Sequence, residues 1–112
     1  MLFFICFLIG SSLAESAIIL NDLSYVDKGR AEIQSGKLTA ARSTLDQCIR
    51  LSNEQEQINE CQWELGWVHW KNGHWNEVVS TWENLYARQP KREGLERYLN
   101  QARDNLSLDS LL

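Results

Sequence analysis

The sequence of 112 residues lacks the short motifs that mark most catalytic and metal sites. It contains no H-E-x-x-H and no C-x-x-C, and Cys61, His69 and His74 do not have the spacing of zinc ligands. A glycine-rich phosphate loop is also missing. We therefore expect no metal, no cofactor and no enzymatic activity.

An excess of basic residues is absent as well. The chain has 11 Lys and Arg against 15 Asp and Glu, which gives a formal net charge of -4. Nucleic-acid phosphates require a basic surface, so this balance argues against a nucleic-acid partner. The charges are mixed along the chain, as on a solvated helical surface. The short basic cluster Arg88 to Arg92 is interrupted by Gln89 and Pro90, and we interpret it as a solvated turn.

A hydrophobic run long enough to cross a membrane does not occur near the start of the sequence. Leu2 to Ile9 is apolar throughout, but a span takes about 20 such residues, and Glu15 ends the segment early. Ser12 and Ala14 fit the small-residue rule of signal peptidase. We predict a signal peptide at 1–14 and a periplasmic or secreted protein with no stable membrane span after cleavage. A membrane anchor is the alternative, since a basic residue before the run is missing.

The strongest local pattern lies between Cys61 and Pro90. No proline interrupts the first part, where Gly66 lets a neighbouring helix approach closely. Asn72-Gly73 then predicts a reversal, because glycine adopts the left-handed conformation that closes a helix. A second helix ends before Pro90, and its apolar residues recur at spacings of three and four: Trp75, Val78, Val79, Trp82, Leu85 and Tyr86. The pattern predicts an antiparallel helix pair.

These residues resemble a tetratricopeptide repeat (TPR), whose pattern is W-x2-L-G-x2-Y, then A-x3-F, then P within 34 residues. The positions that fall on matching offsets are Leu65, Gly66, Val78, Trp82 and Pro90. Gln62, His69 and Val78 replace the Trp, Tyr and Ala of the pattern. The resemblance is therefore specific in this repeat, with three departures.

A weaker upstream copy occupies the same offsets with Tyr25, Gly29, Gly36, Ala41, Leu45 and Cys48. Gly36 and Gly73 are separated by 37 residues (36 to 73), so we place three extra residues in the Asn53–Gln57 linker. A third apolar stripe consists of Leu95, Leu99, Ala102 and Leu106. The resemblance implies an all-α domain at 15–112. It would contain two TPR-like antiparallel helical hairpins, about 22–55 and 59–92, and a C-terminal capping helix at about 93–107.

The repeat register implies a disulfide. It places Cys48 on the inner face of one helix and Cys61 near the start of the next, which packs against it. Cys6 would leave with the signal peptide, so these two cysteines allow one pairing. In an oxidising compartment, we expect a bridge that stabilises the fold by about 3 kcal/mol. The alternative is two buried thiols that act as small hydrophobic side chains.

Five tryptophans within 20 residues exceed what a TPR core requires. In the family register, Trp63, Trp67 and Trp70 line the groove in which TPR proteins hold a peptide or a partner's helix. Tryptophan is a common interface anchor. The candidate groove residues are Trp63, Trp67, Trp70, Lys71 and Arg30, which do not form the family's Lys, Asn and Arg clamp for a C-terminal carboxylate. The alternative is that the stripe belongs to the core, where we expect Trp75 and Trp82 in either case.

The resemblance implies a protein–protein interaction module, an adaptor or scaffold with a protein or peptide partner. One alternative is a structural solenoid that forms a homo-oligomer, because two repeats leave an uncovered apolar end. Another is a regulatory segment related to a larger enzyme. Function rests here on analogy, since a fold does not determine it.

Overall fold

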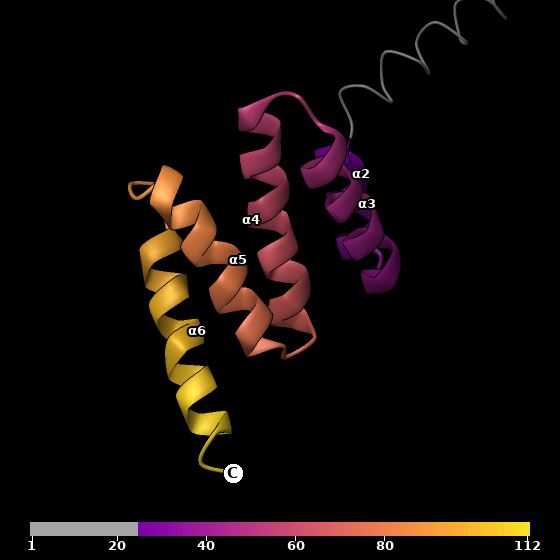
Figure 1. Cartoon of the computed structure of the whole chain (residues 1–112). Helices are drawn as coiled ribbons and strands as arrows, with labels where there is room; N and C mark the ends of the chain where they lie inside the picture. Colours follow the sequence, from indigo (N-terminus) through magenta and orange to yellow (C-terminus); the bar gives the residue numbers. More distant parts are fainter. Residues whose placement is uncertain (1–24) are drawn as a thin grey trace, which may run out of the picture.

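The computed structural model describes residues 25–112, and within them the chain forms helices and no strand (Figure 1). The predicted all-α fold is confirmed. The predicted signal peptide at 1–14 lies outside the described residues. The helices are α2 (Tyr25–Gln34), α3 (Leu38–Leu51), α4 (Gln55–Lys71), α5 (Trp75–Arg88) and α6 (Leu95–Asp109).

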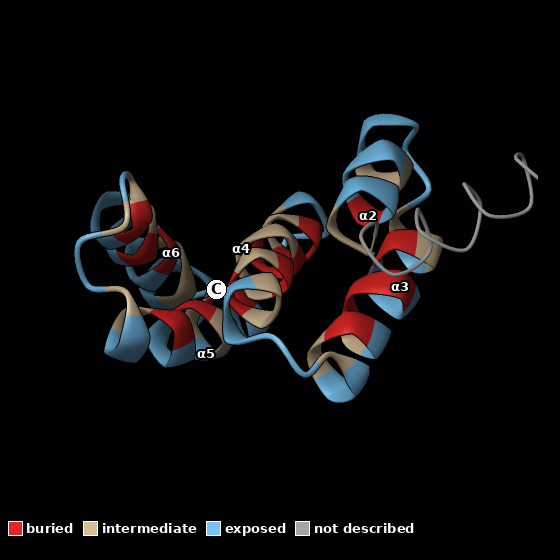
Figure 2. Cartoon of the chain, turned by 90° about the horizontal axis from the view of Figure 1, so that it is seen from above, coloured by how far each residue is buried: buried red, intermediate tan, exposed pale blue. Residues whose placement is uncertain are grey.

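Each helix packs against the next one along the chain, and α2 also packs along α4. The pairs α2 with α3 and α4 with α5 are the two predicted hairpins, and α6 is the predicted capping helix (Figures 1 and 2). Figure 2 shows α4 between the first hairpin and the pair formed by α5 and α6. This central helix therefore has a neighbour on both sides.

The two hairpin turns have the same backbone structure. Gly36 and Gly73 have positive φ values of 77° and 70°. The amide of Gly36 donates to the carbonyl of Ile33, and the amide of Gly73 donates to that of Trp70, both at 3.0 Å. This left-handed closure satisfies carbonyls that the end of a helix leaves free. The reversal predicted at Asn72-Gly73 is confirmed, and Gly36 closes the first hairpin in the same way.

Two other glycines allow close helix contacts inside the hairpins. A Cβ atom on Gly66 would lie 1.8 Å from Nε1 of Trp82, and one on Gly29 would lie 2.6 Å from Cδ2 of Leu45. In both hairpins the glycine precedes its partner by 16 residues (29 to 45 and 66 to 82). The shared spacing supports the alignment of the degenerate first repeat with the second.

Two hydrophobic clusters lie on opposite sides of α4. The first joins α3 to one side of α4 and contains Ala41, Leu45, Cys48, Cys61, Leu65 and Val68. The second joins α5 to α6 and contains Val78, Trp82, Leu85, Leu95, Leu99 and Ala102. Tryptophans from the other side of α4 pack against the second cluster. Which of the two clusters a side chain of α4 joins therefore depends on the side of the helix from which it projects.

Cys48 and Cys61 form a disulfide between α3 and α4, as expected from the repeat register. Both cysteines are fully buried in the first cluster. Their Cα atoms are 6.4 Å apart, within the range of native disulfides. The covalent bond therefore links the first hairpin to the second.

The linker between the hairpins is shorter than expected. Only Ser52–Glu54 is non-helical, and α4 already begins at Gln55. The extra residues that we placed in the Asn53–Gln57 linker therefore lie largely in the first turn of α4. Ser52 makes this early start favourable, because its hydroxyl donates to Oε1 of Gln57 at 2.7 Å and accepts from the amide of Glu54 at 3.2 Å.

The end of α5 and the start of α6 follow from Pro90 and Gly94. Pro90 disfavours helical geometry in the preceding residue, and α5 ends at Arg88. Gly94 has a φ of 81° and precedes α6. The exposed residues of α6 include Glu96, Arg97, Asn100 and Arg103, as in a helix that caps a stack. Within residues 25–112, every helix is too short or too polar to span a membrane.

Candidate functional site

One side of α4 carries most of the candidate binding residues. Residues three or four positions apart lie on the same side of a helix. We call this side the groove face, defined by Glu60, Trp63, Glu64, Trp67, Trp70 and Lys71. The other side carries Cys61, Leu65 and Val68 into the first cluster. The groove face is therefore the side turned away from α3.

The tryptophans of the groove face are neither fully buried nor free. The ring of Trp63 stacks on that of Trp82, with 5.1 Å between centroids. Trp67 meets Trp82 and Tyr98 edge to face, each at 4.9 Å, and Trp70 meets Trp75 at 5.0 Å. All three tryptophans, Trp63, Trp67 and Trp70, are partly exposed, and we call them the tryptophan stripe.

The core partners differ in their burial. Trp82 is fully buried, as expected, and its indole N–H donates to the carbonyl of Trp63 at 3.3 Å. Trp75 was also expected in the core, but it keeps part of its surface exposed. It is the first residue of α5 and follows the turn at Gly73. The tryptophan stripe thus covers the core with one ring surface and reaches solvent with another.

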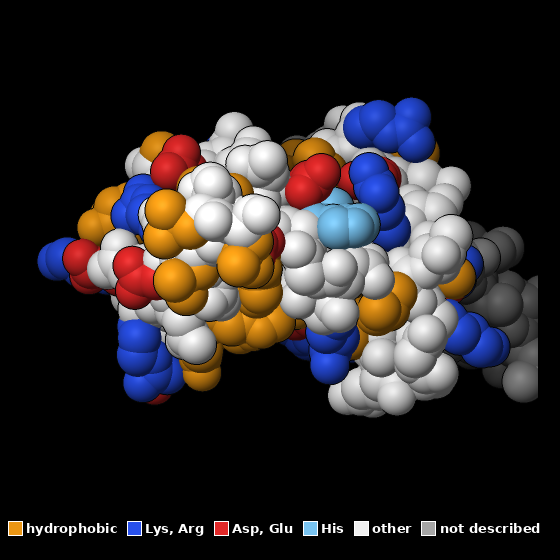
Figure 3. Space-filling model, turned by 90° about the horizontal axis from the view of Figure 1, so that it is seen from below, with side chains coloured by type: hydrophobic (Ala, Val, Ile, Leu, Met, Phe, Trp, Pro, Cys, Tyr) orange, Lys and Arg blue, Asp and Glu red, His pale blue; other side chains and the backbone are white. Residues whose placement is uncertain are grey.

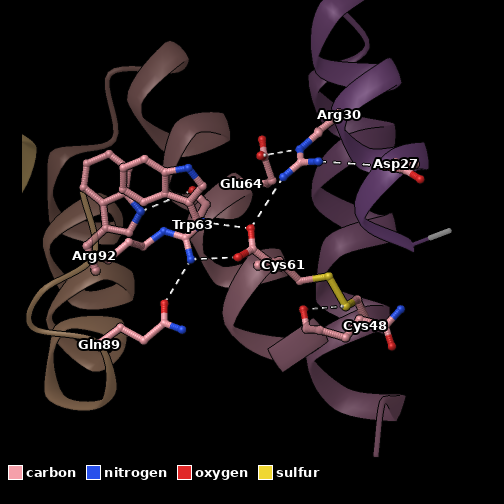
Figure 4. A network of polar contacts seen from close by, with 11 residues as sticks. Asp27, Arg30, Cys48, Cys61, Trp63, Glu64, Gln89 and Arg92 are labelled. Atoms are coloured by element: carbon pink, nitrogen blue, oxygen red, sulfur yellow. Dashed lines mark hydrogen bonds and ion pairs between the residues drawn. A yellow bond between two sulfur atoms is a disulfide. The ribbon is translucent and has the colours of Figure 1, made fainter. Parts of the chain in front are cut away.

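Ion pairs connect α2, α4 and the turn between α5 and α6 across the groove face (Figure 4). Arg30 donates from Nε to Oε1 of Glu64 at 2.7 Å and from Nη2 to Oε2 of Glu60 at 3.5 Å. Arg92 donates to both oxygens of Glu60, at 2.9 and 2.8 Å. The hydrogen bond from Arg92 lowers the pKa of Glu60, and the bond to Glu64 raises the pKa of Arg30. Glu60 is therefore shared between two arginines.

The structure brings some predicted site residues together and leaves one apart. Arg30 joins the ionic network beside the tryptophan stripe, as Figure 4 shows for Arg30, Glu64 and Trp63. Lys71 is the exposed last residue of α4, and among the described residues it makes no hydrogen bond or ion pair through its side chain. Whether these residues bind a partner stays a prediction.

The interpretation of Arg88 to Arg92 as a solvated turn holds for the exposed Arg88, Pro90 and Lys91, but it was wrong for Arg92. The side chain of Arg92 is only 17% exposed, and its guanidinium lies 4.9 Å from the ring centroid of Trp63. Arg88 donates to Asn59 at 2.9 Å and to Asn84 at 2.6 Å. A polar network on α4 holds both arginines. Sequence reasoning also missed Glu60, although it lies one helical turn before Trp63 and Glu64.

His69 is the one buried side chain in residues 25–112 that has a polar atom without a hydrogen-bond partner, Nδ1. Burial lowers its pKa; Arg42 of α3 and His74 act in the same direction, against Glu77 and Asp46. The unfolded chain therefore takes up a proton below a pH of about 6.5, before the folded protein does. The contribution of the neutral His69 to the stability of the fold should be fully present above that pH and should be lost as the pH drops.

We expect the stability of His69→Gln to depend less on pH than that of the natural protein. The melting temperature of the natural protein should fall more steeply between pH 7 and pH 5 than that of the variant, because glutamine does not titrate. His74→Gln is the matched control, since His74 is exposed. A wild-type slope that survives in His69→Gln would contradict the assignment.

No group of three or more His, Cys, Asp and Glu side chains in residues 25–112 is arranged to hold a metal ion. The hairpins and the paired glycines correspond to the TPR-like pattern of the sequence.

Comparison with protein families matches residues 21–102 to the family described as Iml2/Tetratricopeptide repeat protein 39. The chain belongs to this family. Searches of curated proteins and of solved structures each found no match. Membership in the Iml2/Tetratricopeptide repeat protein 39 family confirms the TPR resemblance over most of the chain. A TPR-type family is generally non-catalytic and points to protein–protein interaction.

Proposed function

We propose that this chain is a non-catalytic adaptor whose protein partner binds the groove face. The observation that carries the proposal is the row of three half-buried tryptophans on one side of α4. Tryptophan supplies a large contact area with few rotatable bonds and is enriched among binding hot spots. The surrounding contacts hold these rings in place, so little conformational entropy is lost on binding.

The test compares a surface ring with a core ring. Trp67→Ala should weaken partner binding at least tenfold and cost less than half the stability lost in Trp82→Ala. The core substitution should cost about 3 to 5 kcal/mol, since Trp82 is fully buried. The partner is first captured from host extract with the natural protein, and its affinity is then measured by calorimetry.

Trp67→Phe is the matched control, because it keeps an aromatic ring beside Tyr98 and should retain most of the binding. If Trp67→Ala unfolds the domain as severely as Trp82→Ala, the stripe belongs to the core. If it leaves binding unchanged, the partner binds elsewhere.

Self-association is the second candidate, and exposed leucines favour it. Leu108 is 60% exposed and Leu111 is 82% exposed, beside Leu112 at the same end of α6. Figure 3 shows hydrophobic side chains gathered on the half of the molecule that contains α5 and α6. Size-exclusion chromatography with light scattering separates the candidates, because a monomer at every concentration argues for a different partner.

We also propose that the protein acts in an exported, oxidising compartment, as a periplasmic or secreted protein. The apolar run at Leu2 to Ile9 and the cysteine pair support this location. Mass spectrometry of protein from its host should find Cys48 linked to Cys61 and the chain starting after Ala14. Two freely alkylated thiols would reject the proposed compartment.

A further inference from the structure

Arg92 occupies a site built for a guanidinium group. Glu60 accepts from both terminal nitrogens of Arg92, and Oε1 of Gln89 accepts from Nη1 at 2.9 Å. The indole of Trp63 covers one face of the guanidinium at 4.9 Å. We call the group of Glu60, Trp63 and Gln89 the arginine seat (Figure 4). A carboxylate that accepts two parallel hydrogen bonds beside an aromatic ring is specific for arginine, because lysine has no planar group with two such donors.

A second arginine lies at the edge of the seat. Arg30 reaches Glu60 at 3.5 Å and Glu64 at 2.7 Å. The side chain of Glu64 is 13% exposed, whereas that of Glu60 is 37% exposed. Glu60 therefore remains accessible from solvent although it pairs with both Arg30 and Arg92.

Two of the three seat residues, Glu60 and Gln89, also line an acidic hollow. In the described part of the chain, this hollow has a volume of about 1060 Å³ and borders Glu60, Arg30 and Gln89. Its charged lining consists of Asp27, Arg30, Glu54, Glu56 and Glu60, so four carboxylates oppose one guanidinium. A cleft with this excess of negative charge attracts cations and repels acidic segments.

We propose that the hollow binds an arginine-bearing segment of a protein partner, one arginine of which replaces Arg92 in the seat. The proposal rests on the proposed function and specifies its partner. Exchange of one guanidinium for another leaves the carboxylate of Glu60 paired throughout. Arg92 lies in the turn between α5 and α6, where it competes with the partner from within the chain.

Calorimetry with synthetic peptides tests this exchange on the full chain. The probes are three ten-residue peptides that alternate Gly and Ser with three Arg, three Lys or three Glu. The Arg peptide should bind Arg92→Ala about tenfold more tightly than the natural protein, because the seat is empty. Glu60→Gln should weaken that binding at least tenfold, and the Lys peptide should bind several-fold more weakly.

Arg97→Ala is the matched control. Arg97 also lies over an aromatic ring, 4.8 Å from the centroid of Tyr98, but it does not belong to the seat, so its loss should leave the affinity unchanged. Arg92→Lys provides a second variant if Arg92→Ala does not fold. It keeps the charge but loses the fork, and it should still bind the Arg peptide several-fold more tightly than the natural protein.

The proposal is overturned if emptying the seat leaves the affinity for the Arg peptide unchanged, or if the Lys or Glu peptide binds equally well. Dimerisation of Arg92→Ala without peptide would also overturn it, by making a second copy the occupant. The outcome is separable from the proposed function. Partner binding that depends on Trp67 without any binding of the Arg peptide rejects only the arginine seat, and the reverse rejects only the tryptophan stripe.

Discussion

Gly66→Ala should destabilise the protein by about 3 kcal/mol, although alanine favours helices more than glycine by about 1 kcal/mol. The added Cβ would lie 1.8 Å from Nε1 and 2.2 Å from Cε2 of Trp82. The indole is rigid and fully buried, so it cannot turn away without moving α5. Urea denaturation followed by circular dichroism measures the loss.

Gly29→Ala is the matched control for this effect. Its Cβ would meet Cδ2 of Leu45 at 2.6 Å and Cγ at 2.8 Å. Because a leucine side chain adjusts more readily than an indole, we expect a loss of about 1 kcal/mol. In Gly66→Ala/Trp82→Leu the indole that the added Cβ would meet is replaced by a smaller side chain, so the two substitutions should cost less together than the sum of their separate costs. Additive losses would show that the close contact is not the cause.

Removal of the disulfide should have an effect of similar size. Cys48 and Cys61 are separated by 13 residues, and a closed loop of that length constrains the unfolded chain by about 3 kcal/mol. The double variant Cys48→Ala/Cys61→Ala should lose this stability and some packing in the first cluster. Differential scanning calorimetry of the natural and double-variant proteins provides the comparison.

A reducing agent supplies the control for the disulfide prediction. It should lower the melting temperature of the natural protein and leave that of Cys48→Ala/Cys61→Ala unchanged. Equal melting temperatures of the natural protein with and without reductant would show that the bond contributes nothing to stability.

Local sequence rules were sufficient for the hairpins. Gly36 and Gly73 were recognised because a left-handed closure needs glycine, and Pro90 because proline restricts the residue before it. The repeat offsets also aligned Gly29 with Gly66, although the surrounding residues of the first repeat depart from the family pattern. These features depend on backbone conformation or on contacts at a fixed spacing, which a sequence pattern records.

The ionic part of the candidate site depends on contacts between distant segments, so local patterns did not reveal it. Arg92 lies 32 residues after Glu60, and its pairing follows from how the turn before α6 folds over α4. The early start of α4 at Gln55 depends on side-chain contacts of Ser52. Partial exposure of the tryptophan stripe depends on how far Tyr98 of α6 reaches toward α4.

The two sides of α4 differ in how they are attached. Toward α3 the attachment is a covalent bond inside a fully buried cluster, whereas toward α6 it consists mainly of ring contacts such as that between Trp67 and Tyr98. Ring contacts can slide and re-form, but a disulfide fixes the distance between two backbones. Displacement on ligand binding should therefore be carried mainly by α6, because the close contact between Gly66 and the buried Trp82 holds α5 against α4.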